Sequence, residues 1–360
     1  MIGKVETGMW GIAGNERAVA AVARAVADGS CAHAYLFVGP ERVGKAATAG
    51  RLAQAVNCVG AAVPCLDCRA CTRIGNGIHA DVQTVTVEPG EDGAQRTAIS
   101  VEQVREIERA VALNPFEGKT RVVILDPADE MSPQAQNAFL KTLEEPPPHV
   151  IFVLIARREE RLLETVRSRC RRIGFSLAPV AVIERVLLER EAPPEQARLL
   201  ARLSRGRAGW ALEMASDAQA AGRRREALES ARALARMTVA QRLDLAERLS
   251  DDFKRDREGV LTLLAQWQDW WRDVLLTGCG AEEGMANLDM AEELREDAAR
   301  HGAREAAAFV QALREARQQL EENVQSRVAL EALVLQAPTA ALPAGQAGPG
   351  AAVAAELSTS

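Results

Sequence analysis

This sequence has no long apolar run, few aromatic residues and no excess of basic charge. No stretch of about eighteen apolar residues occurs, and the N-terminus has no basic segment followed by an apolar one. We therefore expect neither a membrane span nor a secretory signal, and a cytoplasmic location. The net charge of −6 does not indicate a protein that coats nucleic acid. Aromatic residues make up 4% of the 360 residues, whereas Ala, Leu, Arg and Glu are abundant, which favours a helix-rich chain of two or three domains.

A phosphate-binding loop is the first motif that carries chemistry. The apolar run 35–38 predicts a buried strand. Gly39, Gly44 and Lys45 follow it in the spacing G-x-x-x-x-G-K, in which backbone N–H groups surround a phosphate and the lysine reaches the outer phosphates. The next position normally carries Ser or Thr, whose hydroxyl holds Mg²⁺, but here it is Ala46. The sequence therefore predicts a nucleotide site that has lost a metal ligand.

Four of the seven cysteines are clustered, at Cys58, Cys65, Cys68 and Cys71. Thiolates at this spacing can form a tetrahedral Zn²⁺ site from one short loop, and four ligands leave no open position, so we expect structural zinc. In a cytosolic chain such clustering favours metal over disulfides or unrelated buried thiols. His79 lies close in the sequence, but four cysteines already complete the site.

Strands and helices alternate over roughly the first half of the chain. One apolar strand ends in Asp126, and in phosphate-loop proteins an acid at this place helps to position Mg²⁺. Ser100 is a candidate helix N-cap, with Gln103 three residues later. The alternation predicts an α/β fold with a parallel sheet wrapped by helices. We expect strands over 35–38, 82–87, 122–125 and 150–155, and helices over 12–27, 46–57, 101–113, 132–144 and 162–166.

After Pro179 the sequence predicts helices alone. Gly206 and Gly209 are expected to interrupt the helical pattern before Trp210. The segment Arg223-Arg224-Arg225 is expected to be a solvated helix face. From Pro338 onward Ala, Gly and Pro dominate, which predicts a disordered tail. Further helices are expected over 180–191, 194–203 and a long block from about 240 to 335.

Three tryptophans lie in this long helical block, at Trp267, Trp270 and Trp271. Their spacing of i, i+3 and i+4 is that of one buried helix face. We therefore interpret them as core residues and not as a platform on which bases stack.

Several stretches together resemble the bacterial clamp-loader subunits of the AAA+ class. They are the run His-Ala-Tyr-Leu-Phe-Val-Gly-Pro at 33–40, the four-cysteine insert, the string Leu-Lys-Thr-Leu-Glu-Glu-Pro-Pro at 140–147, and Ser-Arg-Cys at 168–170. The match is strong over roughly the first 180 residues and looser in the helical remainder. The resemblance implies an AAA+ domain over 1–178 with a zinc insert at 58–71, a helical lid over 179–239, a helical collar for oligomerisation over 240–337, and a tail over 338–360.

Two kinds of subunit share this architecture, an ATP-hydrolysing gamma/tau motor and a delta-prime subunit that is usually inactive. The motor carries a glutamate after its Walker B acid, but here Asp126 is followed by proline. The positions that sense the γ-phosphate correspond to Ala156 and Arg157, and the lid position that holds an arginine in the motor corresponds to Gly209. With Ala46, four parts of the hydrolytic site are absent. We therefore expect no intrinsic ATPase activity and weak or absent ATP binding.

Arg169, in the Ser-Arg-Cys motif, resembles the arginine finger that these subunits present to the ATP of a neighbour. Without the motif, a salt-bridged structural arginine would be the better interpretation. The resemblance implies a non-hydrolysing delta-prime-like subunit of the DNA polymerase III clamp loader, which braces a ring with gamma/tau and delta subunits. That complex, at the nucleoid-associated replisome, loads a sliding clamp on primer-template DNA.

Two other functions are consistent with parts of the sequence. The first is a motor ATPase whose catalytic groups lie elsewhere, against which Pro127 counts most directly. The second is a zinc-dependent nucleic-acid-binding module. Against it, only Arg69 and Arg73 supply basic charge in the cysteine insert, and no aromatic residue is available there for stacking on bases.

Overall fold

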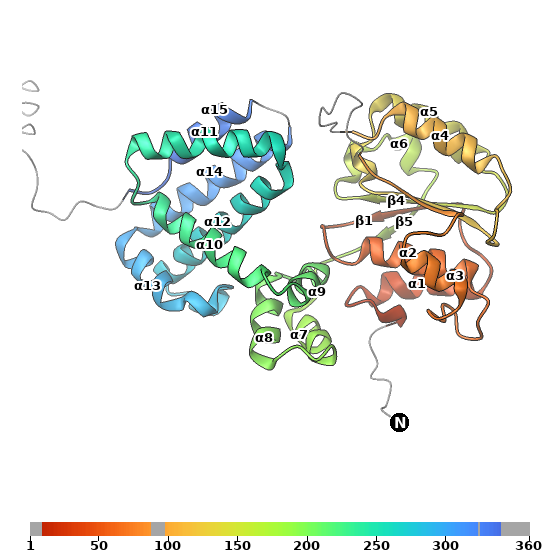
Figure 1. The fold of residues 1–360 in the computed structure, drawn as a ribbon, viewed down its shortest axis with the longest axis horizontal. Helices are drawn as coiled ribbons and strands as arrows, with labels where there is room; N and C mark the ends of the chain where they lie inside the picture. The colour runs from red at the N-terminus through yellow and green to blue at the C-terminus, as the bar shows by residue number, and fades with distance from the viewer. Residues whose placement is uncertain (1–8, 88–97, 323–324, 340–360) are drawn as a thin grey trace, which may run out of the picture. The chain divides into compact units, whose positions relative to one another are not determined.

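The computed structural model describes residues 9–87, 98–322 and 325–339, which divide into two compact units after Asp217. Figure 1 shows the first unit as a sheet with helices and the second as helices alone. Among the described residues, no helix combines the length and the apolar character that a membrane crossing requires.

The first unit is built on a five-stranded parallel sheet in the order β2-β3-β4-β1-β5. The strand β1 lies between β4 and β5, and Val38 at its end pairs with both Ala156 and Gly174. The strands are β1 (Ala34–Val38), β2 (Val82–Val85), β3 (Arg121–Leu125), β4 (Val150–Ala156) and β5 (Arg171–Gly174). The expected parallel sheet is therefore confirmed.

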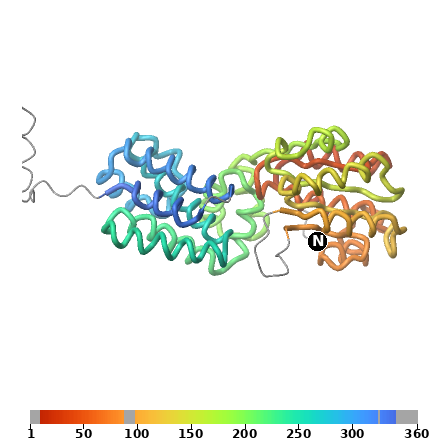
Figure 2. The backbone as a smooth tube through the Cα atoms, turned by 90° about the horizontal axis from the view of Figure 1, so that it is seen from above, coloured from red at the N-terminus to blue at the C-terminus, as the bar shows by residue number. Residues whose placement is uncertain are grey.

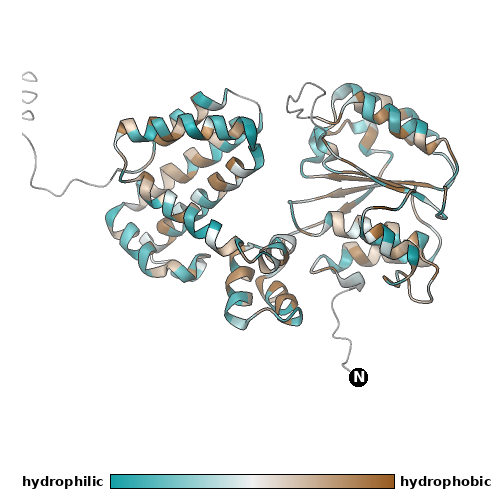
Figure 3. Cartoon of the chain, in the orientation of Figure 1, coloured by the Kyte–Doolittle hydropathy of each residue, from teal (hydrophilic) through white to brown (hydrophobic). Residues whose placement is uncertain are grey.

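Helices cover both faces of this sheet (Figure 1). On one face α1 (Glu16–Ala27), α2 (Lys45–Asn57) and α3 (Arg69–Gly75) pack on Tyr35 and Phe37 of β1. On the other face α4 (Val101–Val111), α5 (Pro133–Glu144) and α6 (Glu164–Arg167) pack on Leu36 and Phe152. Because both faces are covered, the inner strands are apolar at nearly every position, and they appear brown in Figure 3. The short helices η1 (Met9–Gly11), η2 (Ala128–Glu130) and η3 (Glu159–Arg161) lie in the connections.

Two helix starts in this unit follow from their capping residues. The Ser100 side chain accepts the N–H of Gln103, whose side chain in turn accepts the N–H of Ser100, so the expected cap is a complete capping box. The Ser132 side chain caps α5 by accepting the N–H of Ala135, with Pro133 at the first helical position.

Three elements differ from the expectations. The strand β5 was not predicted, because its only buried residue is Ile173 and it forms the edge of the sheet. The short helix α3 lies within the cysteine insert, where only a loop was expected. Gly209 does not interrupt a helix but lies inside α9 (Ala208–Ser216), which follows α7 (Val180–Glu189) and α8 (Pro194–Leu203).

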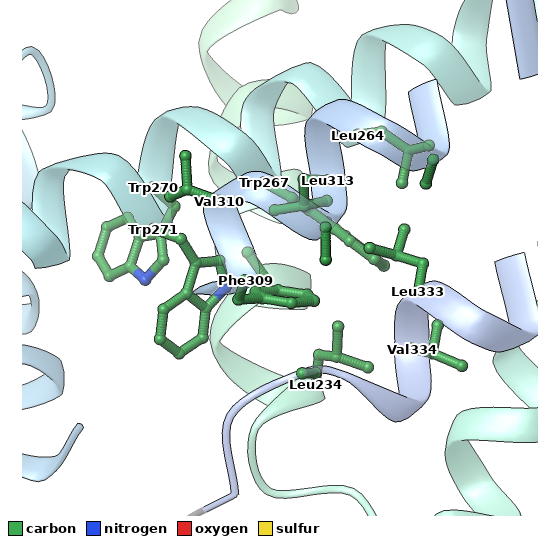
Figure 4. Close-up of a cluster of buried hydrophobic side chains, with 14 of the residues drawn as sticks. Leu234, Leu264, Trp267, Trp270, Trp271, Phe309, Val310, Leu313, Leu333 and Val334 are labelled. Atoms are coloured by element: carbon green, nitrogen blue, oxygen red, sulfur yellow. The ribbon is translucent and has the colours of Figure 1, made fainter. Parts of the chain in front are cut away.

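The second unit is a set of helices around the three tryptophans. Trp267, Trp270 and Trp271 of α12 are completely buried, and Trp271 packs edge-on against Phe309 of α14 with ring centres 5.5 Å apart (Figure 4). The tryptophans are thus core residues, as expected. The helix α12 packs on α14, and α11 lies beside α15 (Figure 2). The helices are α10 (Ala220–Leu234), α11 (Val239–Arg255), α12 (Arg257–Gly278), α13 (Ala291–Arg300), α14 (Ala303–Glu321) and α15 (Ser326–Leu335), with η4 (Glu282–Gly284) and η5 (Leu288–Met290).

The helix α10 falls in the range 179–239 that the resemblance assigned to the lid, and its Leu228 and Leu234 pack in the core of the second unit. The expected solvated face at 223–225 is wrong for Arg224, which is buried and bonded to Asp289 (2.6 Å) and Asn287 (2.5 Å). Helical periodicity turns Arg224 inward while both of its neighbours stay exposed. The expected boundaries at 178 and 239 stay predictions, and residues 340–360 of the expected tail lie outside the described residues.

Candidate functional site

The phosphate loop connects the end of β1 to the start of α2, at the carboxyl edge of the sheet. Gly39 has φ 149° and Gly44 has φ 101°, a region that favours glycine. A Cβ atom at Gly39 would lie 2.2 Å from the carbonyl oxygen of Phe175, so no other residue fits there without a shift of the backbone. The two glycines that the motif predicts are therefore required by the fold of this loop.

Lys45 is buried at the first position of α2. Its ammonium donates to the carbonyl oxygens of Gly39, Pro40 (2.9 Å) and Ala156 (3.1 Å). Burial lowers the pKa of Lys45, and the charge of Asp126 opposes this shift. The lysine of the motif is thus held by the carbonyl oxygens of its own loop and of the adjacent strand.

Asp126 follows β3 directly, and its carboxyl group interacts electrostatically with the ammonium of Lys45. Burial raises the pKa of its carboxyl group, and the ammonium of Lys45 opposes the rise. Ala46 and Asp126 line the same cavity of about 320 Å³. The cavity that holds the acid expected to assist a metal ion is thus lined by a methyl group where the motif would supply a hydroxyl.

Arg157 occupies the place expected for the γ-phosphate sensor, immediately after β4. Its guanidinium pairs with Glu41 of the phosphate loop (2.8 Å) and with Glu130 (3.1 Å). The carboxylate of Asp129 accepts the backbone N–H groups of Arg157 (3.2 Å) and Arg158 (3.0 Å), which fixes this turn. The sensor position thus connects the loop to the turn after β3.

Gly209, at the position where the motor carries a lid arginine, contacts the loop through its backbone. Its N–H donates to the carbonyl oxygen of Arg42 (2.7 Å), and the Arg42 guanidinium pairs with Glu213 (2.5 Å). A Cβ atom at 209 would lie 2.8 Å from that carbonyl oxygen. A glycine at this position permits the helix α9 to contact the loop directly.

Arg169 lies two residues after the end of α6. Its guanidinium donates to the carbonyl oxygen of Thr165 (2.8 Å) and to the carboxylate of Glu144 (2.5 Å), and the side chain is 33% exposed. The next residue anchors the motif, because Cys170 packs against the core and burial raises its pKa to about 12. The arginine is therefore held at two points and still reaches the surface.

Arg169 and the phosphate loop lie at opposite edges of the sheet. The strand β5 begins at Arg171, which pairs with Tyr35, whereas the loop begins after Val38, which pairs with Gly174. Three residue steps in parallel strands span about 10 Å. The structure thus brings together Gly39, Gly44, Lys45 and Asp126, and it places Arg169 apart from them.

The four cysteines form one cluster, with all Sγ atoms within 4.8 Å of one another. Cys58 lies directly after α2 and Cys71 lies within α3, so two helices and the segment between them build the cluster, and not one short loop as expected. In a tetrahedral zinc site with Zn–S bonds of about 2.3 Å, the sulfur atoms lie about 3.8 Å apart. The donor set therefore fits a four-coordinate metal ion.

Backbone N–H groups point at the sulfur atoms of this cluster. Those of Gly60 (3.3 Å) and Cys65 (3.4 Å) donate to Cys58, and that of Cys68 donates to Cys65 (3.3 Å). Backbone hydrogen bonds, of which that from Val59 has the largest effect, lower the pKa of Cys68 to about 6. This favours the thiolate, the form that binds metal. Burial instead raises the pKa of Cys71 to about 12.

His79, which was considered and left out as a ligand, has another partner. Its ring is buried, and Nδ1 accepts the backbone N–H of Asp81 (3.1 Å). Of the described residues, the group that could hold a metal ion consists of the four cysteines without this histidine.

Comparisons with known proteins agree with the resemblance. The family described as "DNA polymerase III, delta subunit" matches residues 14–178. DNA polymerase III subunit delta' of Bacillus subtilis is 30% identical over 307 residues, which cover 84% of this chain and 90% of that protein. The chain belongs to the delta' family of DNA polymerase III subunits.

Two further similarities extend beyond the delta' family. DNA polymerase III subunit tau of Bacillus subtilis is 37% identical over 166 residues, which cover 46% of this chain and 28% of that protein. A solved DNA polymerase III, gamma subunit-related protein of Thermotoga maritima is 18% identical, with a TM-score of 0.44, and the alignment covers 88% of this chain and 97% of that one.

Sequence reasoning on this delta' family member missed the partners of its candidate residues. Glu144 belongs to the string that carried the resemblance, but it lies 25 residues before Arg169, and no spacing rule connects them. The contact of Gly209 with Arg42 joins positions that are far apart in the chain. Such contacts depend on how the elements pack, which a single sequence does not reveal.

Proposed function

We propose that this chain is a non-hydrolysing, delta'-like subunit of a bacterial clamp loader that supplies Arg169 to the ATP of a neighbouring subunit. The observation that carries the proposal is the position of Arg169 at the amino edge of the sheet, opposite to the chain's own phosphate loop. An arginine there is remote from its own Lys45 but accessible to another molecule. An arginine supplied by one subunit to another's ATP is worth about 10³–10⁵ in rate.

The chain's own phosphate loop supports the non-hydrolysing part of the proposal. The hydroxyl that holds Mg²⁺ is absent at Ala46, and no carboxylate follows Asp126 to orient the attacking water. Arg157 is paired with two carboxylates, and Gly209 offers no side chain to the loop. The loop keeps Lys45 and its glycines, so weak binding of ATP is compatible with these contacts, but turnover is not expected.

The remaining parts of the proposal concern the metal and the assembly. We assign structural zinc to Cys58, Cys65, Cys68 and Cys71, where it would stabilise the insert between α2 and β2. The partners would be gamma/tau and delta subunits, with the helical second unit as the site of assembly. Through that ring the chain would help to load a sliding clamp on primer-template DNA.

The test is the ATPase activity of the isolated chain and of its mixture with a gamma/tau and a delta subunit. We expect no turnover by the chain alone, stimulation of the mixture, and loss of the stimulation in Arg169→Ala. Arg172→Ala is the matched control, because Arg172 is also a surface arginine in an ion pair, with Glu159 (2.6 Å). Stimulation that survives Arg169→Ala would overturn the proposal, and turnover by the isolated chain would favour a motor ATPase.

A further inference from the structure

Arg169 and Glu144 join the two most specific motifs of the sequence, Ser-Arg-Cys and Leu-Lys-Thr-Leu-Glu-Glu-Pro-Pro. The Arg169 Nη2 atom lies 2.5 Å from a carboxylate oxygen of Glu144, and Nη1 donates to Thr165 in the preceding helix. The guanidinium is thus bound from two separate elements, α5 and α6. A short contact between opposite charges is among the stronger hydrogen bonds of proteins.

Glu144 belongs to a helix that is packed on the core. It is the last residue of α5, and its neighbour Leu143 and the ring of Phe139 are buried in the core beneath the helix. The helix ends here because three prolines follow at 146–148, and proline does not continue a helix. The backbone position of Glu144 is therefore set by the packing of α5 on the core.

We propose that Glu144 is a positioning residue that holds Arg169 ready for the phosphate of a neighbouring subunit, an inference that rests on the function proposed above. A guanidinium carries five N–H donors, and the contacts with Thr165 and Glu144 use one donor on each of its terminal nitrogens. The other donors stay available to an incoming phosphate. A long side chain that is already ordered loses less rotamer freedom on docking, which favours productive geometry.

Glu145 provides a matched control in the same helix end. It has the same carboxylate, is also exposed and precedes the same prolines. Within the described parts of the chain its carboxylate makes no hydrogen bond or ion pair, whereas that of Glu144 binds Arg169. Glu144→Gln and Glu145→Gln therefore remove the same charge from adjacent positions, and only the first removes the partner of Arg169.

The experiment compares both variants as full chains in the mixture with gamma/tau and delta subunits. We expect Glu144→Gln to lower the kcat of the stimulated ATPase about three- to tenfold, with unchanged KM for ATP and unchanged assembly on a sizing column. Glu145→Gln should stay within about twofold of the wild type, and Glu144→Asp should recover part of the loss. An unchanged or raised kcat in Glu144→Gln would overturn the inference, and a raised value would show that Glu144 restrains the arginine.

A second measurement is independent of activity. The Arg169 Nε–H group, observed by ¹⁵N relaxation in the isolated full chain, should be ordered in the wild type and in Glu145→Gln and more mobile in Glu144→Gln. Equal order in all three chains would overturn the positioning role even if kcat fell. If Arg169→Ala leaves the stimulation intact, the proposed function fails and the inference fails with it. If Arg169→Ala abolishes the stimulation but Glu144→Gln has no effect, only the inference fails.

Discussion

The backbone N–H of Gly209 donates to the carbonyl oxygen of Arg42 at 2.7 Å, so the start of α9 rests directly on the phosphate loop. The Arg42 side chain returns to α9 through its ion pair with Glu213. A Cβ at position 209 would lie 2.8 Å from this carbonyl oxygen, so glycine is the residue that permits the contact.

Gly209→Ala is predicted to disturb this contact. The added Cβ would lie 2.8 Å from the carbonyl oxygen of Arg42, a backbone atom that does not move without a shift of the loop. We expect a loss of about 1–3 kcal/mol in the free energy of unfolding and faster cleavage by trypsin after Arg42. Gly222→Ala is the control, since nothing lies within 4 Å of its added Cβ and alanine favours its helix. Equal trypsin sensitivity in the two variants would contradict the prediction.

Removal of zinc is predicted to destabilise the first unit. The four clustered cysteines could hold one metal ion, and a structural metal site contributes folding free energy. We expect about one zinc per chain by elemental analysis, and a lower Tm after chelation or in Cys68→Ser. Cys279→Ser is the control, because Cys279 is an exposed thiol outside the cluster. A chelated protein that melts like the untreated one would exclude a structural role for the metal.

The sequence predicted the elements whose pattern is local. The apolar runs of β1, β3 and β4 are buried on both faces, and such runs are recognisable without knowledge of the fold. The cap at Ser100 and the cysteine cluster follow in the same way from short spacings. In each case the residues that define the feature lie within a few positions of one another.

Elements that depend on distant partners were not predictable. The strand β5 carries Arg171 and Arg172 and one buried residue, so only its pairing with β1 makes it a strand. Arg224 looks like part of a solvated basic run until the packing of α10 places it against Asp289. The glycine at 209 looks like a helix breaker, but its small size serves a close contact with the loop.

Asp81 lies directly before β2, and we predict that its carboxylate holds the loop that precedes β3. Its buried carboxylate accepts the N–H groups of Phe116 (2.7 Å), Glu117 (2.8 Å) and Gly118 (2.8 Å) and pairs with Arg121 (3.1 Å). Burial alone would raise its pKa, but these hydrogen bonds lower it to about 2.

The carboxylate therefore contributes stability above its unfolded pKa of about 3.9, which is lost as pH falls toward 2. We expect Asp81→Asn to lower the free energy of unfolding by about 2–4 kcal/mol at pH 7, since an amide oxygen replaces a charged acceptor and Arg121 loses its partner. Urea unfolding at pH 7 measures this loss. Asp67→Asn, at an exposed site, should change it by less than about 0.5 kcal/mol, and a similar change in both would contradict the role of Asp81.

His301 is predicted to make the stability of the second unit decrease at mildly acidic pH. The ring is 2% exposed and packs edge-on against Trp271, with ring centres 5.3 Å apart. Burial lowers its pKa, and the charges of Asp297 and Glu305 oppose the shift only in part, while those of Arg300 and Arg236 add to it.

The folded pKa thus lies below the unfolded value of about 6.5, so protonation favours the unfolded chain. The stability that the neutral ring contributes is complete above the unfolded pKa. It decreases as the pH falls from the unfolded pKa toward the folded pKa. Urea unfolding of the full chain, followed by the fluorescence of the tryptophans, should give a midpoint that decreases between pH 7.5 and 5.5. His301→Gln should have a lower midpoint at pH 7.5, because the edge contact with Trp271 is lost, but a weaker decrease with pH. The same pH dependence in His301→Gln as in the wild type would show that another group titrates in this range.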